Sequence, residues 1–465
     1  MEIHHPELAE EPNHLNLKFH MGLQAGEAAR KLYPNGKMIL NNDDLSIALE
    51  ETRYLIGNFP DLPLFEAAFE HNGILIRTDI IENTEQGYRV VEVKSSTGFK
   101  DYHLLDCAVQ FWVINNAGYP IEQIEIALVN KDFIYSGNGD YKDLFIFEDV
   151  TEAIIPILEH IPAWLDKYQD VIKGDLPDIK VGKHCHKPFK CPFFNHCFTE
   201  LPEYPVTILP RGGKIIMELV SEGISDIRDI PEDRLIKPLH QRIRRTTITG
   251  EPELAPEMAE YLGYLPYPRY YLDFETIQFA VPVWPDTSPY NQLPFQWSCH
   301  TEEKSGHLRH SEFLDTSGNP PMRPFAENLL NTLRTKGPIF VYSGFEKNNL
   351  KKLAKMFPDL AQGIYNIIER LVDLLPIAQK YYYHPRMKGS WSIKAVLPTI
   401  APELDYKNLE EVQDGTGAQI AYLEAIRPET PKKRRDEIAH RMLEYCKMDT
   451  MALVKMVWFF SGEKG

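Results

Sequence analysis

The sequence contains little cysteine: six residues in 465, of which three fall between positions 185 and 197. So few thiols argue against a disulfide framework and favour a reducing, cytoplasmic setting. Long apolar runs are missing as well, so no segment is expected to span a membrane. The first residues, MEIHHPELAEEPNHLN, lack the apolar core of a signal peptide. We therefore expect a cytoplasmic protein without a membrane partner.

Positive charge is also scarce. The 50 Lys and Arg residues are outnumbered by 67 Asp and Glu residues, and the formal net charge is −17. This excess argues at first against a polyanionic partner, but sites that bind cations concentrate carboxylates, which the cations then neutralise. Two basic runs, HQRIRR at 240–245 and PKKRRDEIAHR at 431–441, are each more simply explained as solvated helix faces. Charge alone therefore neither requires nor excludes a nucleic-acid partner.

The order of hydrophobic patterns predicts two α/β units. A chain of 465 residues is too long for one ordinary core. Up to residue 168, and again from residue 269, segments with strand periodicity alternate with segments of helix periodicity. Residues 201–262 carry short helices punctuated by Gly and Pro, with no strand pattern. The expected strands are residues 73–81, 88–96, 121–130, 143–150, 269–277, 295–303, 308–315 and 337–344, and the expected helices are residues 14–33, 101–118, 151–168, 325–335 and 434–460.

Asp79, Glu92 and Lys94 form the first candidate catalytic group. Glu92 and Lys94 are two positions apart on a predicted strand, so both side chains leave the same face. A hairpin register that pairs Glu92 with Arg77 or Asp79 adds Asp79 to that face, whereas a slip by one residue removes it. Carboxylates bind Mg²⁺ or Mn²⁺ through oxygen, and a neighbouring Lys can orient the attacking water. The plain alternative is an exposed ion pair on a hairpin.

This group resembles the core of PD-(D/E)xK nucleases of the RecB-like branch. Gln110, in CAVQFWVI, matches the glutamine that those enzymes carry on the following helix. The family's usual Gln-x-x-x-Tyr pattern is broken, because Ile114 stands where Tyr is expected. The resemblance implies that Asp79 and Glu92 bind the metal. It also implies catalytic roles for Lys94 and Gln110.

A second acidic group is spread over the C-terminal part of the chain. Asp273 and Glu275 are two positions apart on a predicted strand and share one face. Tyr445 and Asp449 are four positions apart in a predicted helix and lie on one side of it. The order of Asp-x-Glu, a middle acid and Tyr-x-x-x-Asp resembles the DEDD exonucleases of the ribonuclease H-like fold, in their Tyr variant. The resemblance implies that the carboxylates hold two divalent metals roughly 4 Å apart, with the Tyr helping to place the water.

The middle acid of that pattern has two candidates. In the family it is usually an Asp after a strand with a Phe before it, and here Glu346 follows Phe345. Asp373, in LVDLL, is the rival, although in the family that position more often supports the fold than the metal. Lys394, in SIKAVLP, is a further candidate that can reach substrate phosphate, with an ordinary surface Lys as the alternative.

Three cysteines at equal six-residue steps, Cys185, Cys191 and Cys197, form the remaining candidate site. Zinc sites usually show C-x₂₋₄-C pairs, which this spacing does not match. Three unrelated thiols are an alternative, but Pro188, Pro192 and the neighbouring aromatic residues predict a compact loop around them. An iron–sulfur cluster is held by four thiolates. Some RecB-like nucleases carry one, bound by one Cys from the N-terminus and three just after the nuclease core.

The whole chain resembles a bacterial family of uncharacterised RecB-like proteins that join such a nuclease to a C-terminal ribonuclease H-like domain. Matching stretches are HHPELAEEPNHLNLKF, RTDI with VEVKSS, HCHKPFKCPFFNHC, YYLDFETI, SIKAVLP and YCKMDT. In that family a Cys-bearing segment before HHPELAEEP looks like the fourth cluster ligand. Here the first cysteine is Cys107, expected to be a core thiol, so we expect the fourth ligand to lie outside the chain as printed.

The resemblance implies an α/β fold with three parts: a restriction-endonuclease-like domain at 1–200, a helical connector at 201–262 and a ribonuclease H-like domain at 263–465. The expected function is metal-dependent hydrolysis of DNA, with a second site that trims 3′ ends of DNA or RNA. A role in DNA repair or defence against foreign DNA follows from the resemblance alone. The expected cofactors are Mg²⁺ or Mn²⁺ and a 4Fe-4S cluster whose fourth ligand is missing from this chain.

Two other functions are compatible with the same residues. One is an adaptor that binds nucleic acid with one or both sites degenerate, which the departures at Ile114 and Glu346 allow. The other is an RNA-processing exonuclease in which the N-terminal domain only grips the substrate. Cleavage assays with Mg²⁺ or Mn²⁺ on DNA and RNA separate these alternatives.

Overall fold

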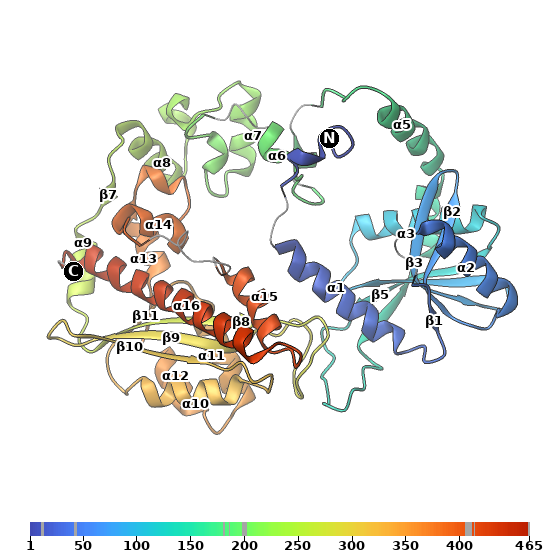
Figure 1. Ribbon diagram of the computed structural model, residues 1–465. Coiled ribbons are helices and arrows are strands. Elements are labelled where there is room, and N and C mark those ends of the chain that lie inside the picture. Colours follow the sequence, from blue (N-terminus) through green and yellow to red (C-terminus); the bar gives the residue numbers. More distant parts are fainter. Residues whose placement is uncertain are drawn as a thin grey trace. The chain divides into compact units, whose positions relative to one another are not determined.

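The computed structural model describes residues 1–10, 14–40, 44–179, 182–185, 187–197, 202–404, 412 and 414–463. The chain divides into two compact units, Met1–Cys197 with Gln278–Asn291 and Phe198–Ile277 with Gln292–Gly465. Each unit combines helices with a β-sheet (Figure 1), which confirms the mixed α/β class predicted from the sequence.

The first unit is built on a six-stranded sheet whose strands lie in chain order. These strands are β1 (Lys37–Met38), β2 (Leu64–His71), β3 (Ile74–Asn83), β4 (Tyr88–Lys94), β5 (Ile121–Val129) and β6 (Phe145–Asp149). The β2–β3–β4 meander is antiparallel, whereas β4 and β5 run parallel. A parallel pair requires a crossover, which the helix α3 (Asp101–Asn116) supplies.

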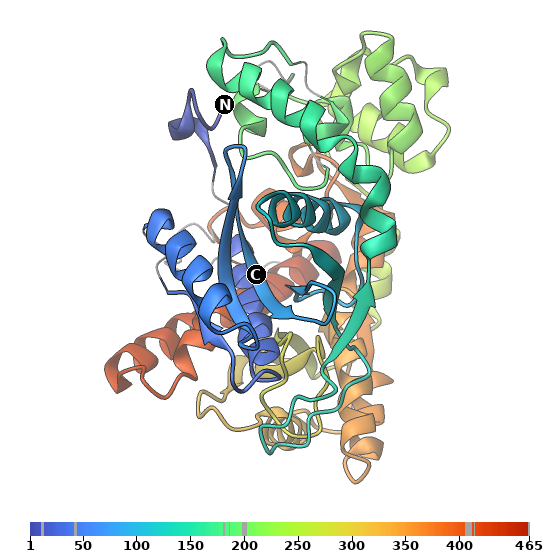
Figure 2. The same cartoon turned by 90° about the vertical axis from the view of Figure 1, so that its right-hand side faces the viewer.

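Helices cover both faces of this sheet, because apolar side chains leave both faces. On one face Ala25 and Ala29 of α1 (His14–Arg30) belong to the same buried cluster as Val91 of β4. On the other face Ala108 of α3 shares a cluster with Val90. Figure 2 shows α3 nearly end-on against the sheet. The remaining helices of this unit are α2 (Leu45–Asn58), α4 (Thr151–Leu158), α5 (Ile161–Lys173) and α6 (Phe194–Cys197).

The single helix predicted at residues 151–168 is two helices in the structure. The helix α4 ends at Leu158, and α5 begins at Ile161 with Pro162 in its first turn. A proline ring fits the first turn of a helix, but inside a continuous helix it removes a hydrogen bond and clashes with the preceding turn. The periodic apolar pattern continues across the break, which explains why the prediction joined the two helices.

One segment of the first unit comes from far along the chain. Residues 278–291 follow the strand that carries Asp273 and Glu275, yet they belong to the first unit. The Thr287 carbonyl accepts the N–H of Tyr135 at 3.0 Å, and the N–H of Asp286 donates to the Tyr135 carbonyl at 2.9 Å. The sequence predicted strands on both sides of this segment and gave no sign of where the segment itself packs.

The second unit contains a five-stranded sheet in the order β10-β9-β8-β11-β12. The pairs β8–β9 and β9–β10 are antiparallel, and β8–β11 and β11–β12 are parallel. The strands are β8 (Arg269–Ile277), β9 (Leu293–Glu302), β10 (Leu308–Leu314), β11 (Ile339–Val341) and β12 (Leu371–Asp373), and a separate two-stranded sheet pairs β7 (Glu253–Leu254) with β13 (Tyr382–Tyr383).

The long helix α16 (Lys432–Ser461) packs across β8 and β9 on one face of this sheet, and α10 (Met322–Thr332) packs against β9 and β10. The other helices of this unit are α7 (Gly213–Ser221), α8 (Pro238–Thr249), α9 (Glu257–Gly263), α11 (Phe345–Met356), α12 (Ala361–Ile368), α13 (Leu374–Tyr381), α14 (Ile393–Ile400) and α15 (Gly415–Ala425). Among the described helices, none combines the length and the apolar character needed to cross a membrane.

The short helices of residues 202–263 share a buried core with α16. Leu219 of α7, Ile243 of α8 and Met258 of α9 lie in the same apolar cluster as Leu453 and Val457 of α16. Burial of these side chains against α16 joins the connector to the second unit. The connector is mainly helical, as predicted from its Gly- and Pro-rich sequence, with β7, two residues long, and an isolated bridge between Pro205 and Asp226 as its β structure.

Candidate functional site

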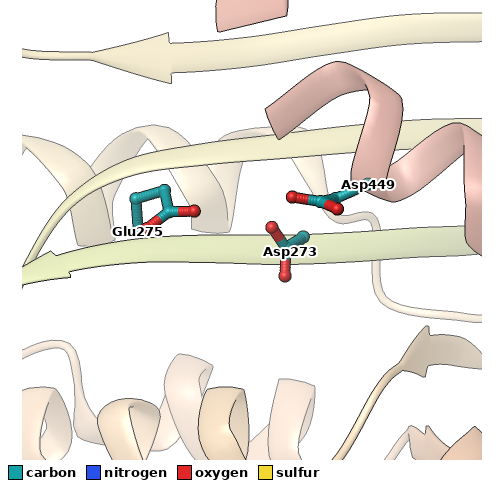
Figure 3. A group of neighbouring side chains, drawn as sticks. All are labelled: Asp273, Glu275 and Asp449. Carbon is teal, nitrogen blue, oxygen red and sulfur yellow. The ribbon is translucent and has the colours of Figure 1, made fainter. Parts of the chain in front are cut away.

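The second unit brings three carboxylates together at the centre of its sheet. Asp273 and Glu275 are two positions apart on β8 and therefore share the face that α16 covers. Asp449 comes from α16 on that side. One oxygen atom of each carboxylate lies within 4.8 Å of the others. Figure 3 shows the Asp273 and Asp449 groups directed toward one another, with Glu275 beside them.

Negative charge is costly at this place. Glu275 and Asp449 are buried, and Asp273 is half-buried. Burial, followed by repulsion from Asp449, raises the pKa of Asp273 well above its ordinary value. Burial, together with repulsion from Asp273 and Asp449, also raises the pKa of Glu275 well above its ordinary value. Acids in such an environment hold protons unless a cation compensates their charge.

Glu346, at the start of α11, lies next to Asp273 but outside the group of three carboxylates whose oxygen atoms lie within 4.8 Å of one another. Burial, followed by the nearby charge of Asp273, raises the pKa of the Glu346 carboxyl group. Glu346 is 1% exposed, and its Oε2 atom has no hydrogen-bond partner among the described residues. A buried carboxyl oxygen that accepts no hydrogen bond is unfavourable in a folded protein. Because Asp273, Glu275 and Asp449 offer hard oxygen ligands, this donor set fits a divalent cation of the Mg²⁺ or Mn²⁺ kind, with Glu346 beside it.

Tyr445 and Lys394 lie beside this acidic group. Tyr445 is one helical turn before Asp449 on α16 and is buried. Lys394 follows the first residue of α14, and its Nζ lies 5.9 Å from the centre of the Tyr445 ring. The exposed Lys394 side chain also lowers the pKa of Glu275, although burial of that acid outweighs this effect. Both side chains therefore lie close to the carboxylates.

Asp373 has a structural role. Its Oδ1 atom accepts the backbone N–H of Leu375 at 2.9 Å and caps α13. The same oxygen accepts the N–H of Ser343 at 2.8 Å. Ser343 has a φ of 93°, a left-handed conformation that a non-glycine residue adopts only when other contacts enforce it. Asp373 thus stabilises the bend that leads from β11 to Glu346, in keeping with its expected support of the fold.

Cys446 was not predicted as part of this site. Its Sγ atom donates to Asp273 Oδ2 at 3.5 Å, and the side chain is fully buried. Burial and the surrounding acids raise the pKa of this thiol, so it is a neutral donor. The available sequence signal was its place directly after Tyr445, three residues before Asp449, where a helix presents it to the same region.

In the first unit, β3 and β4 bring Asp79 and Glu92 together. Ile80 pairs with Val91 across the antiparallel ladder. The next step of the same register faces Asp79 toward Glu92, which is one of the two registers predicted from the sequence. Asp79 Oδ2 also accepts the backbone N–H of Val93 at 2.7 Å. The hairpin register therefore places both acids on the face that α3 covers.

The helix α3 holds the Glu92–Lys94 pair with two side chains. Gln110 Nε2 donates to Glu92 Oε2 at 2.6 Å, and Lys94 Nζ donates to Glu92 Oε1 at 2.5 Å. Lys94 also donates to Asp106 Oδ2 at 2.6 Å. Asp106 was not predicted; its position one helical turn before Gln110 was the available signal. Ile114, one turn after Gln110, is buried in the apolar core.

The protonation of this group depends on burial. Burial, with repulsion from Asp79, raises the pKa of Glu92 to about 8. Burial likewise raises the pKa of Asp79 to about 6. Burial opposes the charge of Lys94, but Glu92 and Asp106 together raise its pKa. Among the described residues, these two acids have no third ligand with which all ligand atoms lie within 4.8 Å.

The cysteine stretch forms a turn in the first unit. The Cys191 N–H donates to the Cys185 carbonyl at 2.9 Å, and the Glu10 N–H donates to the Pro192 carbonyl at 3.0 Å. Cys185 is buried, Cys191 is half-buried and Cys197 is exposed. Within the described residues, their sulfur atoms do not form a group within 4.8 Å of one another. The iron–sulfur cluster expected from the sequence, which needs four thiolates, stays a prediction. Cys107 is buried in the core, as expected.

Comparison with known proteins finds one matching domain family and two uncharacterised relatives. Residues 270–392 match a family described as a domain of unknown function (DUF2779). The uncharacterized protein MG366 of Mycoplasma genitalium is 22% identical over 211 residues, and its homolog in Mycoplasma pneumoniae is 28% identical over 211 residues. Each match covers 41% of this chain and 32% of the relative, so the chain spans about a third of the length of these relatives. No solved structure matches the chain.

Proposed function

We propose that this protein is a metal-dependent nuclease that hydrolyses phosphodiesters of DNA, with a second site that trims 3′ ends. The observation that carries the proposal is the convergence of Asp273, Glu275 and Asp449 within 4.8 Å, with Tyr445 one turn before Asp449. The strand order of the second unit, three antiparallel strands followed by two parallel ones, is the order expected of a ribonuclease H-like sheet and supports the proposal.

The acids of the second unit would hold divalent cations. Asp273, Glu275 and Asp449 would be the ligands, joined by the unpartnered oxygen of Glu346. Bound Mg²⁺ or Mn²⁺ would supply the charge that lowers the pKa of water and stabilises the negative charge of the leaving oxygen.

The side chains beside the carboxylates would bind the substrate and orient the attacking water. The Tyr445 hydroxyl lies on the side of α16 that carries Asp449, where it can donate a hydrogen bond to the attacking water or to a phosphate oxygen. The exposed ammonium group of Lys394 offers charge to the phosphate backbone of the substrate. In the first unit Lys94, held between Glu92 and Asp106, has the position of a residue that orients water beside Asp79. We place the activity in the cytoplasm, in DNA repair or defence.

Two variants separate the two sites. Circular single-stranded DNA has no ends, so its cleavage reports internal cutting, whereas a 5′-labelled linear strand reports trimming from the 3′ end. In the presence of Mn²⁺ we expect Asp79→Asn to slow internal cutting by about a hundredfold or more. We expect Asp273→Asn to slow trimming from the 3′ end by a similar factor. Glu327→Gln, at an exposed position on α10, is the matched control. A double variant that degrades DNA as fast as the parent refutes the proposal.

An RNA exonuclease is the second candidate. Among the described residues, three ligands gather in the second unit, whereas Asp79 and Glu92 lack a third. This difference favours catalysis in the second unit, with the first unit gripping the substrate. Preference for RNA over DNA, together with full activity of Lys94→Ala, identifies this case.

A further inference from the structure

A row of polar side chains on β9 lies directly beside the acidic residues of β8. Gln296, Ser298 and His300 alternate along the strand, and the register pairs Gln296 with Glu275 and Ser298 with Asp273. All three polar residues are at most 2% exposed. A strand face buried under a helix is ordinarily apolar, because each buried polar group needs a partner. The partners of this row are therefore informative.

Two members of the row hold Thr450, the residue after Asp449. The Thr450 hydroxyl lies 2.8 Å from Ser298 Oγ and 2.9 Å from His300 Nδ1. His310 on β10 extends the network, with its Nε2 atom 2.9 Å from Ser298 Oγ. Burial lowers the pKa of His300 to about 3, so this ring is neutral at neutral pH. The contact is a network of neutral hydrogen bonds, whose geometry is directional.

Gln296 attaches α16 at a second point. Its Nε2 atom donates to the Met442 carbonyl at 2.8 Å. Met442 and Thr450 are eight residues apart, which is about 12 Å along a helix. Gln296 and His300 are four residues apart, which is about 13 Å along a strand. Because the two lengths nearly agree, the Gln296–Met442 contact and the His300–Thr450 contact can form together. These two contacts fix both the rotation and the axial position of α16 on β9.

We propose that Thr450 is a positioning residue: held by Ser298 and His300, it sets the rotation of α16 that aims Asp449 at Asp273. Successive residues of a helix point about 100° apart, so fixing the direction of Thr450 also fixes that of Asp449. Metal ligands depend on such supporting contacts, whose loss typically weakens metal binding by about 10- to 100-fold. The inference rests on the proposed function, and it concerns residues that support the metal site without touching the metal.

The test removes one hydroxyl group. Thr450→Val keeps the shape of the side chain and loses the hydrogen bonds, whereas Thr450→Ser retains them. Thr247→Val is the matched control, because Thr247 is a buried helical threonine whose hydroxyl donates to the Ile243 carbonyl of its own helix at 2.7 Å. Full-length proteins are compared in two measurements: amide hydrogen exchange of α16 in EDTA, followed by mass spectrometry, and the Mn²⁺ dissociation constant, from the electron paramagnetic resonance of free Mn²⁺.

The Mn²⁺ measurement uses proteins that also carry Asp79→Asn and Glu92→Gln, so that the first unit does not contribute. We expect Thr450→Val to speed exchange in residues 445–453 and to raise the dissociation constant roughly tenfold. Thr450→Ser should stay within about twofold of the parent, and the control should match the parent.

Three other results of these two measurements would overturn part of the proposal. Exchange in Thr450→Val no faster than in the Thr247→Val control overturns the positioning role of Thr450. Faster exchange with an unchanged dissociation constant overturns its link to the metal site. A parent protein that binds no Mn²⁺ refutes the proposed function instead, and the exchange measurement still decides whether Thr450 positions α16.

Discussion

The carboxyl group of Glu346 lies beside that of Asp273, and its Oε2 atom is buried without a partner among the described residues. Burial and neighbouring negative charges favour the form of each acid that holds a proton. A cation that displaced such a proton would also satisfy the Oε2 atom of Glu346. Glu346 is therefore unfavourable in the metal-free protein and useful once metal is bound.

Substitution of Glu346 should raise the stability of the metal-free protein and weaken its binding of metal. Glu346→Gln keeps a donor toward Asp273 and removes one buried ionisable group, so we expect the metal-free protein to unfold a few degrees higher at pH 8. The stabilisation by 1 mM Mn²⁺ should fall well below that of the parent, because one ligand is lost. Glu327→Gln serves as the control, and thermal unfolding with EDTA or Mn²⁺ is the measurement. Equal Mn²⁺ stabilisation of Glu346→Gln and the parent would exclude Glu346 as a ligand.

The stability of the metal-free protein should fall as the pH rises from about 5 to about 8. In the folded state the pKa of Asp79 is raised to about 6 and that of Glu92 to about 8, mainly by burial. In the unfolded chain such groups release their protons near pH 4. Over this window the folded state binds more protons than the unfolded state, so the free energy of unfolding decreases with rising pH.

Urea unfolding in EDTA across this pH range tests the dependence. A variant with Asp79→Asn and Glu92→Gln should show a flatter profile, because neither replacement titrates. Added Mn²⁺ should stabilise the parent more at pH 8 than at pH 5, since the metal competes with protons for the carboxylates. An identical slope in the parent and this variant would show that the two acids do not cause the dependence.

Asp106 should affect cleavage more than stability. Its side chain is 46% exposed, and an exposed ion pair such as that with Lys94 contributes less than about 1 kcal/mol to folding. The same contact holds Lys94 beside Glu92, so Asp106→Asn should slow internal cleavage of circular DNA roughly tenfold, in kcat rather than KM. Asp166→Asn on α5, another exposed acid of the first unit, is the control. Unchanged kcat in Asp106→Asn would mean that the ion pair is incidental.

Cys185, Cys191 and Cys197 should react with iodoacetamide at different rates in the protein without an iron–sulfur cluster. Cys197 is exposed, Cys191 is half-buried and Cys185 is buried, and access controls the reaction of otherwise ordinary thiols. We expect the order Cys197, Cys191, Cys185, read by mass spectrometry of peptides at successive times. Protection of all three together after anaerobic iron and sulfide treatment would instead indicate a bound cluster, with the visible spectrum as an independent check.

Most of the strands and several site residues follow from local sequence patterns. Strand periodicity of two put Asp273 and Glu275 on one face, and one of the two hairpin registers predicted for Glu92 faces it toward Asp79, as the structure does. Such relations span a few residues, so they depend on strand geometry alone. The break before Ile161 was missed because apolar periodicity continues through it, although Pro162 marks it.

The sequence by itself determined the mixed α/β class, the pairs of polar residues that share a strand or helix face, and the burial of Cys107. Tertiary structure alone decided which of these faces meet. It packed residues 278–291 into the first unit, turned Asp106 toward Lys94, and attached α16 to β9 through Thr450. The physical reason is that local periodicity specifies which way a side chain leaves its own element. The partner that it meets depends on contacts between elements far apart in the chain.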